Sequence, residues 1–279
     1  MRTLNSSPST TGRIHHLFLY LAVITIPLCT AQRVIAQSPK ELVQEAAINE
    51  LRQRESEGLW ESKVERQTGG HAFSEHEIET VDGPIERLLL VDGHPPSEAE
   101  RRNNDVELHN LEHNSSARTK LRKKYLDDEK AFRDLVQEIP EEYLFDFDGR
   151  EGTIRRLTFR PDPAYRPKSY GARIAHAMSG YLLIDEKEKR LVEFSAVTLQ
   201  QVDFGFGLIG RVGKGTTVEF KRIEVAPGIW KKTSSATKMS GRILLFKSVD
   251  KQLIEKKTDW KPMPREMSIS RAVKQLGLP

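Results

Sequence analysis

Residues 178–199 read MSGYLLIDEKEKRLVEFSAVTL, and the fold class follows from this stretch. In Arg190–Leu199 the apolar residues Val192, Phe194 and Ala196 occupy every second position, as in a half-buried strand. Gly180–Asp185 is a second candidate strand, and the turn at Asp185-Glu186-Lys187 joins the two without room for a helix. Strands joined by so short a turn are antiparallel.

The same short-strand pattern covers most of the chain between residues 60 and 260. Gly69-Gly70 and Asp82-Gly83-Pro84 are typical of hairpin turns between such strands. Because helical spacers rarely interrupt the pattern, we predict an antiparallel meander in a mainly β protein with helices (α+β). The other candidate strands are Trp60–Gln67, Phe73–Val81, Ile85–Val91, Tyr143–Asp148, Thr153–Arg160, Gln201–Leu208, Thr216–Val225, Ile229–Ser235, Gly241–Val249 and Leu253–Trp260.

One candidate strand changes its alternation part way along. Val218 and Phe220 alternate with polar residues, but the parity slips at Lys221-Arg222, before Ile223. An extra residue in one strand produces such a slip, so we predict a β-bulge there. The sheet as a whole has one apolar face, which needs a cover of a second sheet, helices or a ligand.

Two segments have helical patterns. Ser38-Pro39-Lys40-Glu41 combines a capping box with proline at the first helical position, and predicts a helix that runs up to Gly58. The charged segment 95–140 predicts a helix, a break near Asn114-Ser115-Ser116 and a second amphipathic helix that Pro140 ends. On the helix that begins at Ser38, the expected apolar stripe is Leu42, Val43, Ala46, Ile48 and Leu51.

Residues 1–36 are predicted to be a signal peptide. Arg2 and Arg13 are the only charges among the first 32 residues, and residues 17–28 are apolar. A run of that length rises less than the roughly 30 Å of a hydrocarbon core. Cleavage after Ala31 and cleavage after Ala36 both fit, and an uncleaved anchor is the alternative. We therefore expect a periplasmic protein.

Removal of this leader changes the charge balance. It takes away three of the 44 Lys and Arg residues and the single Cys, and leaves 41 basic against 40 acidic residues. A near-neutral chain gives no electrostatic basis for nucleic-acid binding. Without Cys, no disulfide framework is expected.

Three motifs suggest chemistry but lack its context. Residues 205–210 spell GxGxxG, yet no helix follows to meet a pyrophosphate, and Gly213-Lys214-Gly215-Thr216 lacks the earlier glycine of a phosphate loop. His109 and His113 spell HxxEH, which on a helix would place both imidazoles on one face of a zinc site. We expect no cofactor, no metal and no enzyme activity, and keep a zinc-dependent hydrolase at His109 and His113 as a minor alternative.

The C-terminal half resembles a known family. The resemblance is clearest over residues 142–262, in Met178–Asp185, Leu191–Phe194, Val202–Leu208, Lys214–Phe220, Trp230 and Gly241–Phe246. These segments are similar to the LolA-like, outer-membrane lipoprotein-sorting family. The chain departs from the best-known carriers in its insertion at 95–140 and in its polar loop at 160–168.

The resemblance implies a strongly curved antiparallel sheet, an unclosed β-barrel, with an N-terminal helix and a helical insertion. It implies one domain over residues 37–263, with residues 264–279 as a C-terminal tail. Such a protein would carry lipoprotein acyl chains or another hydrophobic ligand without catalysis, and would touch the membrane transiently. The apolar lining expected, with ordinary core packing as the alternative for each residue, is Trp60, Leu182, Ile184, Val192, Phe194, Phe204, Phe206, Leu208 and Trp230. A second possibility is an envelope protein–protein interaction module that uses the charged insertion.

Overall fold

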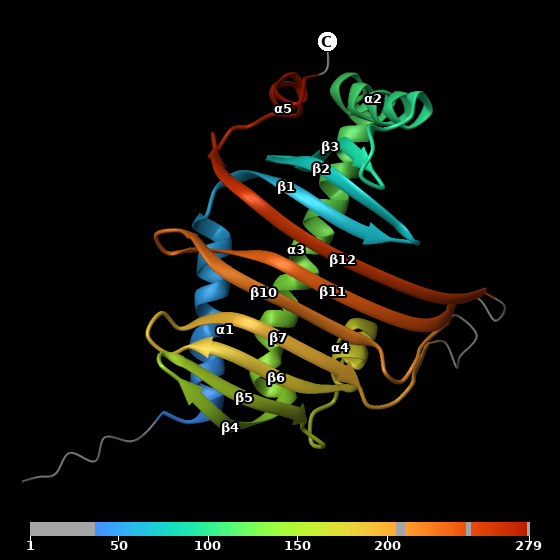
Figure 1. The fold of residues 1–279 in the computed structure, drawn as a ribbon. Helices are drawn as coiled ribbons and strands as arrows, with labels where there is room; N and C mark the ends of the chain where they lie inside the picture. The colour runs from blue at the N-terminus through green and yellow to red at the C-terminus, as the bar shows by residue number, and fades with distance from the viewer. Residues whose placement is uncertain (1–36, 205–209, 244–246, 278–279) are drawn as a thin grey trace, which may run out of the picture. The chain divides into compact units, whose positions relative to one another are not determined.

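The computed structural model describes residues 37–204, 210–243 and 247–277 (Figure 1). The predicted signal peptide lies outside them. The helices in the described part are α1 (Pro39–Ser56), α2 (Glu98–His113), α3 (Ser115–Glu142), α4 (Tyr170–Ala175) and α5 (Ile269–Gln275). In this part of the chain no helix is both long enough and apolar enough to cross a bilayer.

The strands form one mainly antiparallel sheet. They are β1 (Leu59–Thr68), β2 (His71–Thr80), β3 (Gly83–Val91), β4 (Tyr143–Glu151), β5 (Ile154–Pro161), β6 (Met178–Asp185), β7 (Arg190–Thr198), β8 (Val202–Phe204), β9 (Gly210–Val212), β10 (Thr217–Ala226), β11 (Ile229–Ile243) and β12 (Lys247–Met263). Their order is β3-β2-β1-β12-β11-β10-β7-β6-β5-β4, and β8 and β9 branch from β11. Because β3 and β4 end this path without pairing to each other, the sheet is not closed into a barrel.

The predicted start of the first helix is confirmed. Ser38 caps α1, the complete capping box with Glu41 is present, and Pro39 occupies the first turn. Leu42, Val43 and Ala46 are buried as expected, but Ile48 is 47% exposed.

The charged insertion forms two helices separated at Asn114, as predicted. The side chain of Asn114 accepts hydrogen bonds from the backbone of Ser116 and Ala117 and so caps α3. Pro140 does not end the helix, because it lies inside the last turn and α3 continues to Glu142. In the N-terminal half of α3, Tyr125 contacts the β2–β3 turn. Gly83 (φ +116°) lets this turn approach the helix closely, since a Cβ there would lie 3.1 Å from Tyr125 Cβ.

Most strand predictions are confirmed, but the predicted strand boundaries after Ile229 are wrong. The register of β10 against β11 shifts between Lys221 and Arg222, where the bulge was predicted. The predicted break between Ile229–Ser235 and Gly241–Val249 is absent, because β11 runs without interruption from Ile229 to Ile243. Gly241–Val249 was predicted as one strand, but residues 241–243 belong to β11 and residues 247–249 to β12. The predicted break before Leu253 is also absent, because β12 runs from Lys247 to Met263. Gly213–Thr216 forms a turn, with Gly215 at a φ of +81°.

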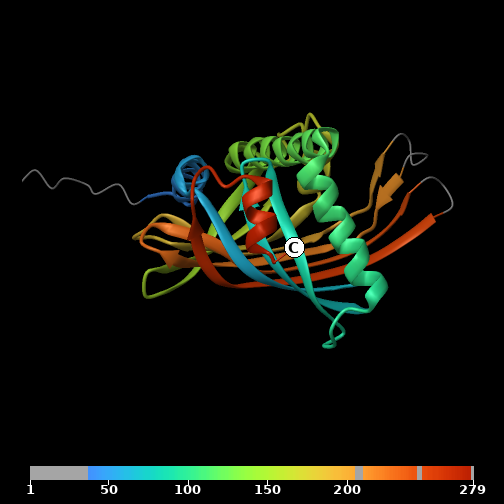
Figure 2. The same cartoon turned by 90° about the horizontal axis from the view of Figure 1, so that it is seen from above.

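Helices α1, α2 and α3 lie on the same side of the sheet (Figures 1 and 2). A first core packs Leu42, Val43 and Ala46 of α1 against Leu182 and Ile184 of β6. A second core joins α5, α2 and the β2–β3 hairpin, and contains Ile78, Ile85, Leu108, Met267, Ile269, Ala272, Val273 and Leu276. The segment after residue 263, which the sequence suggested was a tail, therefore includes a packed helix.

Candidate functional site: a charged cavity under helix α3

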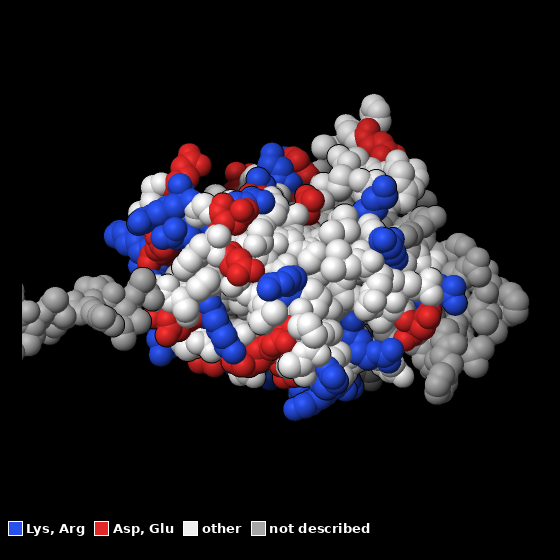
Figure 3. All heavy atoms as spheres, turned by 90° about the horizontal axis from the view of Figure 1, so that it is seen from below, with Lys and Arg blue, Asp and Glu red and all other residues white. Residues whose placement is uncertain are grey.

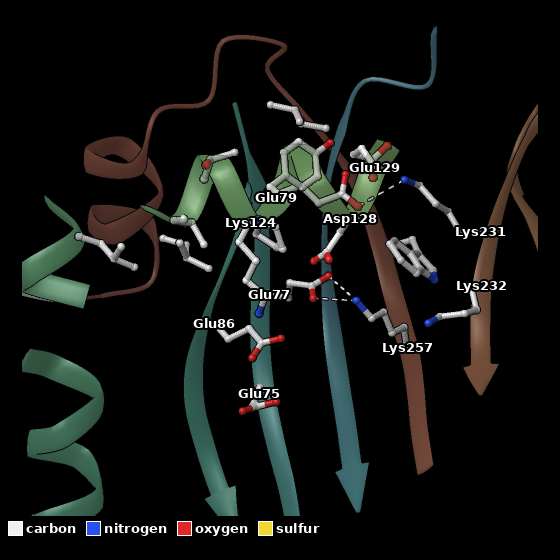
Figure 4. A pocket seen from close by; sticks show the side chains of 18 of the residues that line it. Glu75, Glu77, Glu79, Glu86, Lys124, Asp128, Glu129, Lys231, Lys232 and Lys257 are labelled. Atoms are coloured by element: carbon white, nitrogen blue, oxygen red, sulfur yellow. Dashed lines mark hydrogen bonds and ion pairs between the residues drawn. The ribbon is translucent and has the colours of Figure 1, made fainter. Parts of the chain in front are cut away.

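A cavity of about 570 Å³ lies between the sheet and helices α2 and α3 (Figure 4). The end of α1 and strands β1, β2, β3, β11 and β12 supply its other walls. Its volume falls in the range of small-ligand sites. Charged side chains dominate its lining, which consists of Arg54, Glu57, Gly58, Leu59, Glu75, Glu77, Glu79, Thr80, Pro84, Ile85, Glu86, Asn104, Glu107, Leu108, Leu111, Leu121, Lys124, Tyr125, Asp128, Glu129, Lys231, Lys232, Lys257 and Trp260.

Strand β2 supplies three glutamates to the cavity. Glu75, Glu77 and Glu79 occupy alternate positions of β2, so their side chains leave the same face of the sheet. Figure 4 shows Glu75 and Glu77 in a column below α3, with Glu86 of β3 beside them. Ile78, which lies between two of these glutamates, points the other way into the second core. The second core borders the cavity, because Ile85 and Leu108 belong to both.

Arg66 of β1 connects carboxylates from three other strands. Its guanidinium lies 2.7 Å from Glu75 Oε2, 2.6 Å from Glu86 Oε1 and 3.5 Å from Glu255 Oε2. The two hydrogen bonds to Glu86 form a forked pair, at 3.1 and 2.6 Å. Glu75 Oε2 is buried and has no hydrogen-bond partner among the described residues, in spite of its short distance to Arg66. The guanidinium therefore satisfies Glu86 and leaves Glu75 incompletely bonded.

Lys257 of β12 neutralises the middle glutamate of β2. Its Nζ lies 2.7 Å from both carboxylate oxygens of Glu77 (Figure 4). Burial disfavours the charged ammonium, but the adjacent Glu77 carboxylate outweighs this and raises the pKa of Lys257. Lys257 is therefore charged at neutral pH.

Lys231 of β11 lies between two indole rings. Its Nζ is 5.6 Å from the ring centre of Trp60 and 5.5 Å from that of Trp260. It also lies 3.1 Å from Glu57 and 3.4 Å from Glu79, and its side chain is only 5% exposed. Cation–π contacts and two carboxylates thus compensate for its burial. The Nε1 of Trp260 is itself buried without a hydrogen-bond partner among the described residues.

The glutamates differ in acidity because they share too few cations. Burial and the neighbouring Glu86 raise the pKa of Glu75 to about 7, in spite of Arg66. Burial also raises the pKa of Glu79, although Lys231 opposes this. Burial acts in the same direction on Glu86, but the forked hydrogen bonds from Arg66 outweigh it, so the pKa of Glu86 is lowered. At neutral pH Glu86 is ionised and Glu75 is about half protonated.

The structure places the predicted apolar lining elsewhere. Leu182 and Ile184 are buried in the first core against α1, and Phe194 stacks between Phe159 and Phe220. A register shift pairs Ile184 with Leu191, and Leu191 rather than Val192 packs against that core.

The two predicted tryptophans lie near the cavity but do not line it. Trp60 donates its Nε1 hydrogen to the carbonyl of Glu57, 3.0 Å away, and contacts Lys231. The backbone of Trp230 exchanges hydrogen bonds with the side chain of Gln53. Phe206, Leu208 and the side chain of Phe204 lie outside the described residues, and none of the other predicted lining residues belongs to the cavity wall.

The two histidines of the HxxEH motif do not line the cavity. The rings of His109 and His113 lie 4.2 Å apart on α2, and within the described ranges no three metal-binding side chains come together. The GxGxxG segment falls largely outside the described residues. The charged wall of the cavity was not predicted. One feature of the sequence could have indicated it, which is glutamate at every second position of Glu75–Glu79.

The surface seen from below mixes both signs of charge. In Figure 3, Lys and Arg side chains lie among Asp and Glu side chains, so this face presents no continuous basic stripe of the kind that nucleic acids bind. Comparison with known proteins adds no relative: no family model matches the chain, and neither a curated protein nor a solved structure matches it.

Proposed function

We propose that this chain is an exported, non-catalytic binding protein that holds a small ligand in the cavity under α3. The cavity is the observation that carries the proposal, because its volume of about 570 Å³ suits a small ligand. The signal-peptide pattern and the resemblance to LolA-like carriers support export and a carrier role. We also propose that the sheet is strongly curved, as the resemblance implies.

The lining favours a ligand with polar or charged groups over a bare acyl chain. A methylene chain beside Glu75, Glu77 and Lys257 would displace water from charged groups without replacing its hydrogen bonds, which is costly. Of the apolar residues expected to shelter an acyl chain, Leu182 and Ile184 pack instead in the core that contains α1. A lipid or a lipidated protein is still a candidate ligand in this proposal. Its polar headgroup would bind in the cavity, and its acyl chain would lie outside.

A cavity-filling substitution tests the proposal. Lys124 extends from α3 toward the glutamates of the sheet (Figure 4), so Lys124→Trp should fill the cavity and abolish ligand binding. Its neighbour Lys123 is 74% exposed, and Lys123→Trp is the matched control. Native mass spectrometry of protein purified from its own envelope should show a bound mass of a few hundred daltons. This mass should be absent from Lys124→Trp alone.

Two results would contradict the proposal. One is a wild-type protein that carries no bound mass and does not respond, by tryptophan fluorescence, to amines, acids, sugars or fatty acids. The other is a bound mass that survives equally in both variants, because the ligand would then lie outside the cavity.

Docking of another envelope protein on α2 and α3 is the second candidate. One observation favours it: Val106 and Leu126 of these helices are 63% and 53% exposed. Deletion of the insertion would not test this candidate cleanly, because α2 also contributes Leu108 to the second core. Substituting Val106 and Leu126 with Ser should weaken partner capture and leave ligand binding unchanged.

A further inference from the structure

The cavity wall has an excess of negative charge. Its lining contains eight acidic and five basic residues. The excess is local, since Glu75, Glu77, Glu86 and Glu255 meet around Arg66 and Lys257. Lys232 is also nearby, 3.6 Å from Glu255, and it is half exposed. A partly buried wall with more carboxylates than cations lowers the free energy of an added positive charge.

Glu75 is the group at which this excess is concentrated. Its side chain is 13% exposed, and its buried Oε2 has no hydrogen-bond partner among the described residues. Arg66 lies 2.7 Å from this oxygen but forms no hydrogen bond with it, so the oxygen can still accept a hydrogen bond from a ligand. The charged groups facing Glu75 are Arg66 from β1, Glu77 from its own strand, Glu86 from β3 and Glu255 from β12.

Most of the nearby cations of the protein are already paired with carboxylates. Arg66 is shared among three carboxylates, Lys257 is bound to Glu77, and Lys231 is held by Glu57 and Glu79. Lys124 extends from α3 into the cavity but forms no ion pair with a described residue, and Asp128 stands one turn further along the same helix (Figure 4). A metal ion is a poor candidate, since no three ligating side chains converge in the described ranges.

We propose that the ligand of this cavity is an organic cation, whose protonated amine or guanidinium group lies beside Glu75 and Glu86 and donates a hydrogen bond to Glu75 Oε2. This inference rests on the cavity being a ligand site. An N–H donor adds positive charge to the acidic wall and also supplies the hydrogen bond that Glu75 Oε2 lacks, whereas a sodium ion or a neutral hydroxyl provides only one of the two. Binding then stabilises ionised Glu75, so the cation should displace the proton that Glu75 carries at neutral pH.

Isothermal titration calorimetry with spermidine tests the inference on the full chain. At pH 7, with 150 mM salt to screen surface charge, we expect saturable binding with release of about half a proton per spermidine. Comparing buffers of different ionisation enthalpy measures that release. Because ionised Glu75 binds the cation, the affinity should rise between pH 6 and pH 8 as Glu75 loses its proton.

Glu75→Gln is the decisive variant, since glutamine resembles the protonated side chain and should leave the fold intact. It should weaken spermidine binding about tenfold and abolish the proton release. Glu65→Gln is the matched control, because Glu65 lies on neighbouring β1 with its side chain exposed. It should bind as the wild type does. The pH dependence of wild-type binding provides a second readout that needs no variant.

The outcomes separate this inference from the proposed function. Spermidine bound with proton release that Glu75→Gln removes supports both. Binding of a neutral or anionic compound that Lys124→Trp blocks, with no binding of spermidine, overturns the cationic class and keeps the cavity as the site. Equal spermidine binding by Glu75→Gln and Glu65→Gln indicates surface attraction and overturns the inference. If no compound binds, the proposed function fails as well.

Discussion

Glu142, at the end of α3, is a carboxyl group that folding removes entirely from water. It is 0% exposed, and neither of its oxygens has a hydrogen-bond partner among the described residues. The nearest basic group is Nδ1 of His176, 3.8 Å away, which is also without a hydrogen bond. Burial and the neighbouring Glu138 raise the pKa of Glu142 to about 7. The folded protein thus keeps a proton on Glu142 that the unfolded chain loses near its ordinary pKa.

This proton makes stability depend on pH in a direction opposite to that of a salt-bridged carboxylate. Between the ordinary pKa of Glu and about 7 the folded state binds more protons than the unfolded state, so the free energy of unfolding falls as pH rises. From pH 5.5 to pH 8 Glu142 alone should account for a loss of about 2 kcal/mol. Glu142→Gln should remove that part of the loss, measured by urea unfolding at both pH values.

Glu141→Gln is the control for this experiment, because Glu141 is 59% exposed and its partners, Lys40 and Gln44, are also on the surface. It should keep the wild-type dependence of stability on pH. A Glu142→Gln protein with the same dependence as the wild type would show that Glu142 is ionised in the folded state.

At the scale of single residues, the sequence predicts burial well only where an apolar side chain lies on the face of the helix that meets the core. Leu42 and Val43 were predicted inside and are buried. Ile48 was predicted inside and is exposed, whereas Glu50 and Gln53 of the same helix are buried. The last two bond across to β10 and β11, where Glu50 meets Arg222 and Gln53 meets the backbone of Trp230. Those partners are distant in sequence, so no pattern within α1 could indicate them.

At the scale of elements, β6 and β7 depend on a glycine that lets them pair closely. A Cβ on Gly180 would lie 1.8 Å from the carbonyl oxygen of Ser195 and 2.9 Å from Cα of Ala196. Gly180→Ala should therefore push the two strands apart and lower the free energy of unfolding by about 2 to 3 kcal/mol. Thermal or urea unfolding followed by circular dichroism measures the change.

Gly171→Ala is the matched substitution in α4. Its Cβ would meet only Ser169 Oγ, at 3.8 Å, and alanine favours the helix, so stability should stay the same or rise by up to about 1 kcal/mol. Equal stability of the two variants would refute the close approach at Gly180.

Elements were predictable where a local signal defines them. The capping box at Ser38 and the parity slip at Lys221-Arg222 are local features, and both predictions are confirmed. Helix α5 was missed because its seven residues span about two turns, too few to show a periodic pattern. The continuity of β11 was missed because its middle, from Ser234 to Lys238, is only partly buried and is rich in Ser, Thr and Lys.

At the scale of the whole described fold, the order of the strands could not be read from the sequence. A meander pairs each strand with the next strand in the sequence. This prediction is confirmed for β1-β2-β3, β4-β5-β6-β7 and β10-β11-β12. The pairing of β1 with β12 and of β7 with β10 joins these groups, and these contacts depend on distant residues. The cavity could not be predicted for the same reason, since its charged side chains come from β2, β3, β11 and β12 and from helices α1, α2 and α3.

Helix α5 links the end of the chain to the cavity wall. Val273 is 2% exposed in the second core, which shares Ile85 and Leu108 with the cavity lining. Val273→Asp would bury an unpaired charge, so it should lower the free energy of unfolding by at least about 3 kcal/mol. Loosening this core should also weaken spermidine binding through Ile85 and Leu108. The exposed neighbour Lys274, substituted with Asp, should change stability by less than about 1 kcal/mol and leave binding intact. If Val273→Asp lost neither stability nor binding, α5 would be a dispensable tail, as the sequence alone suggested.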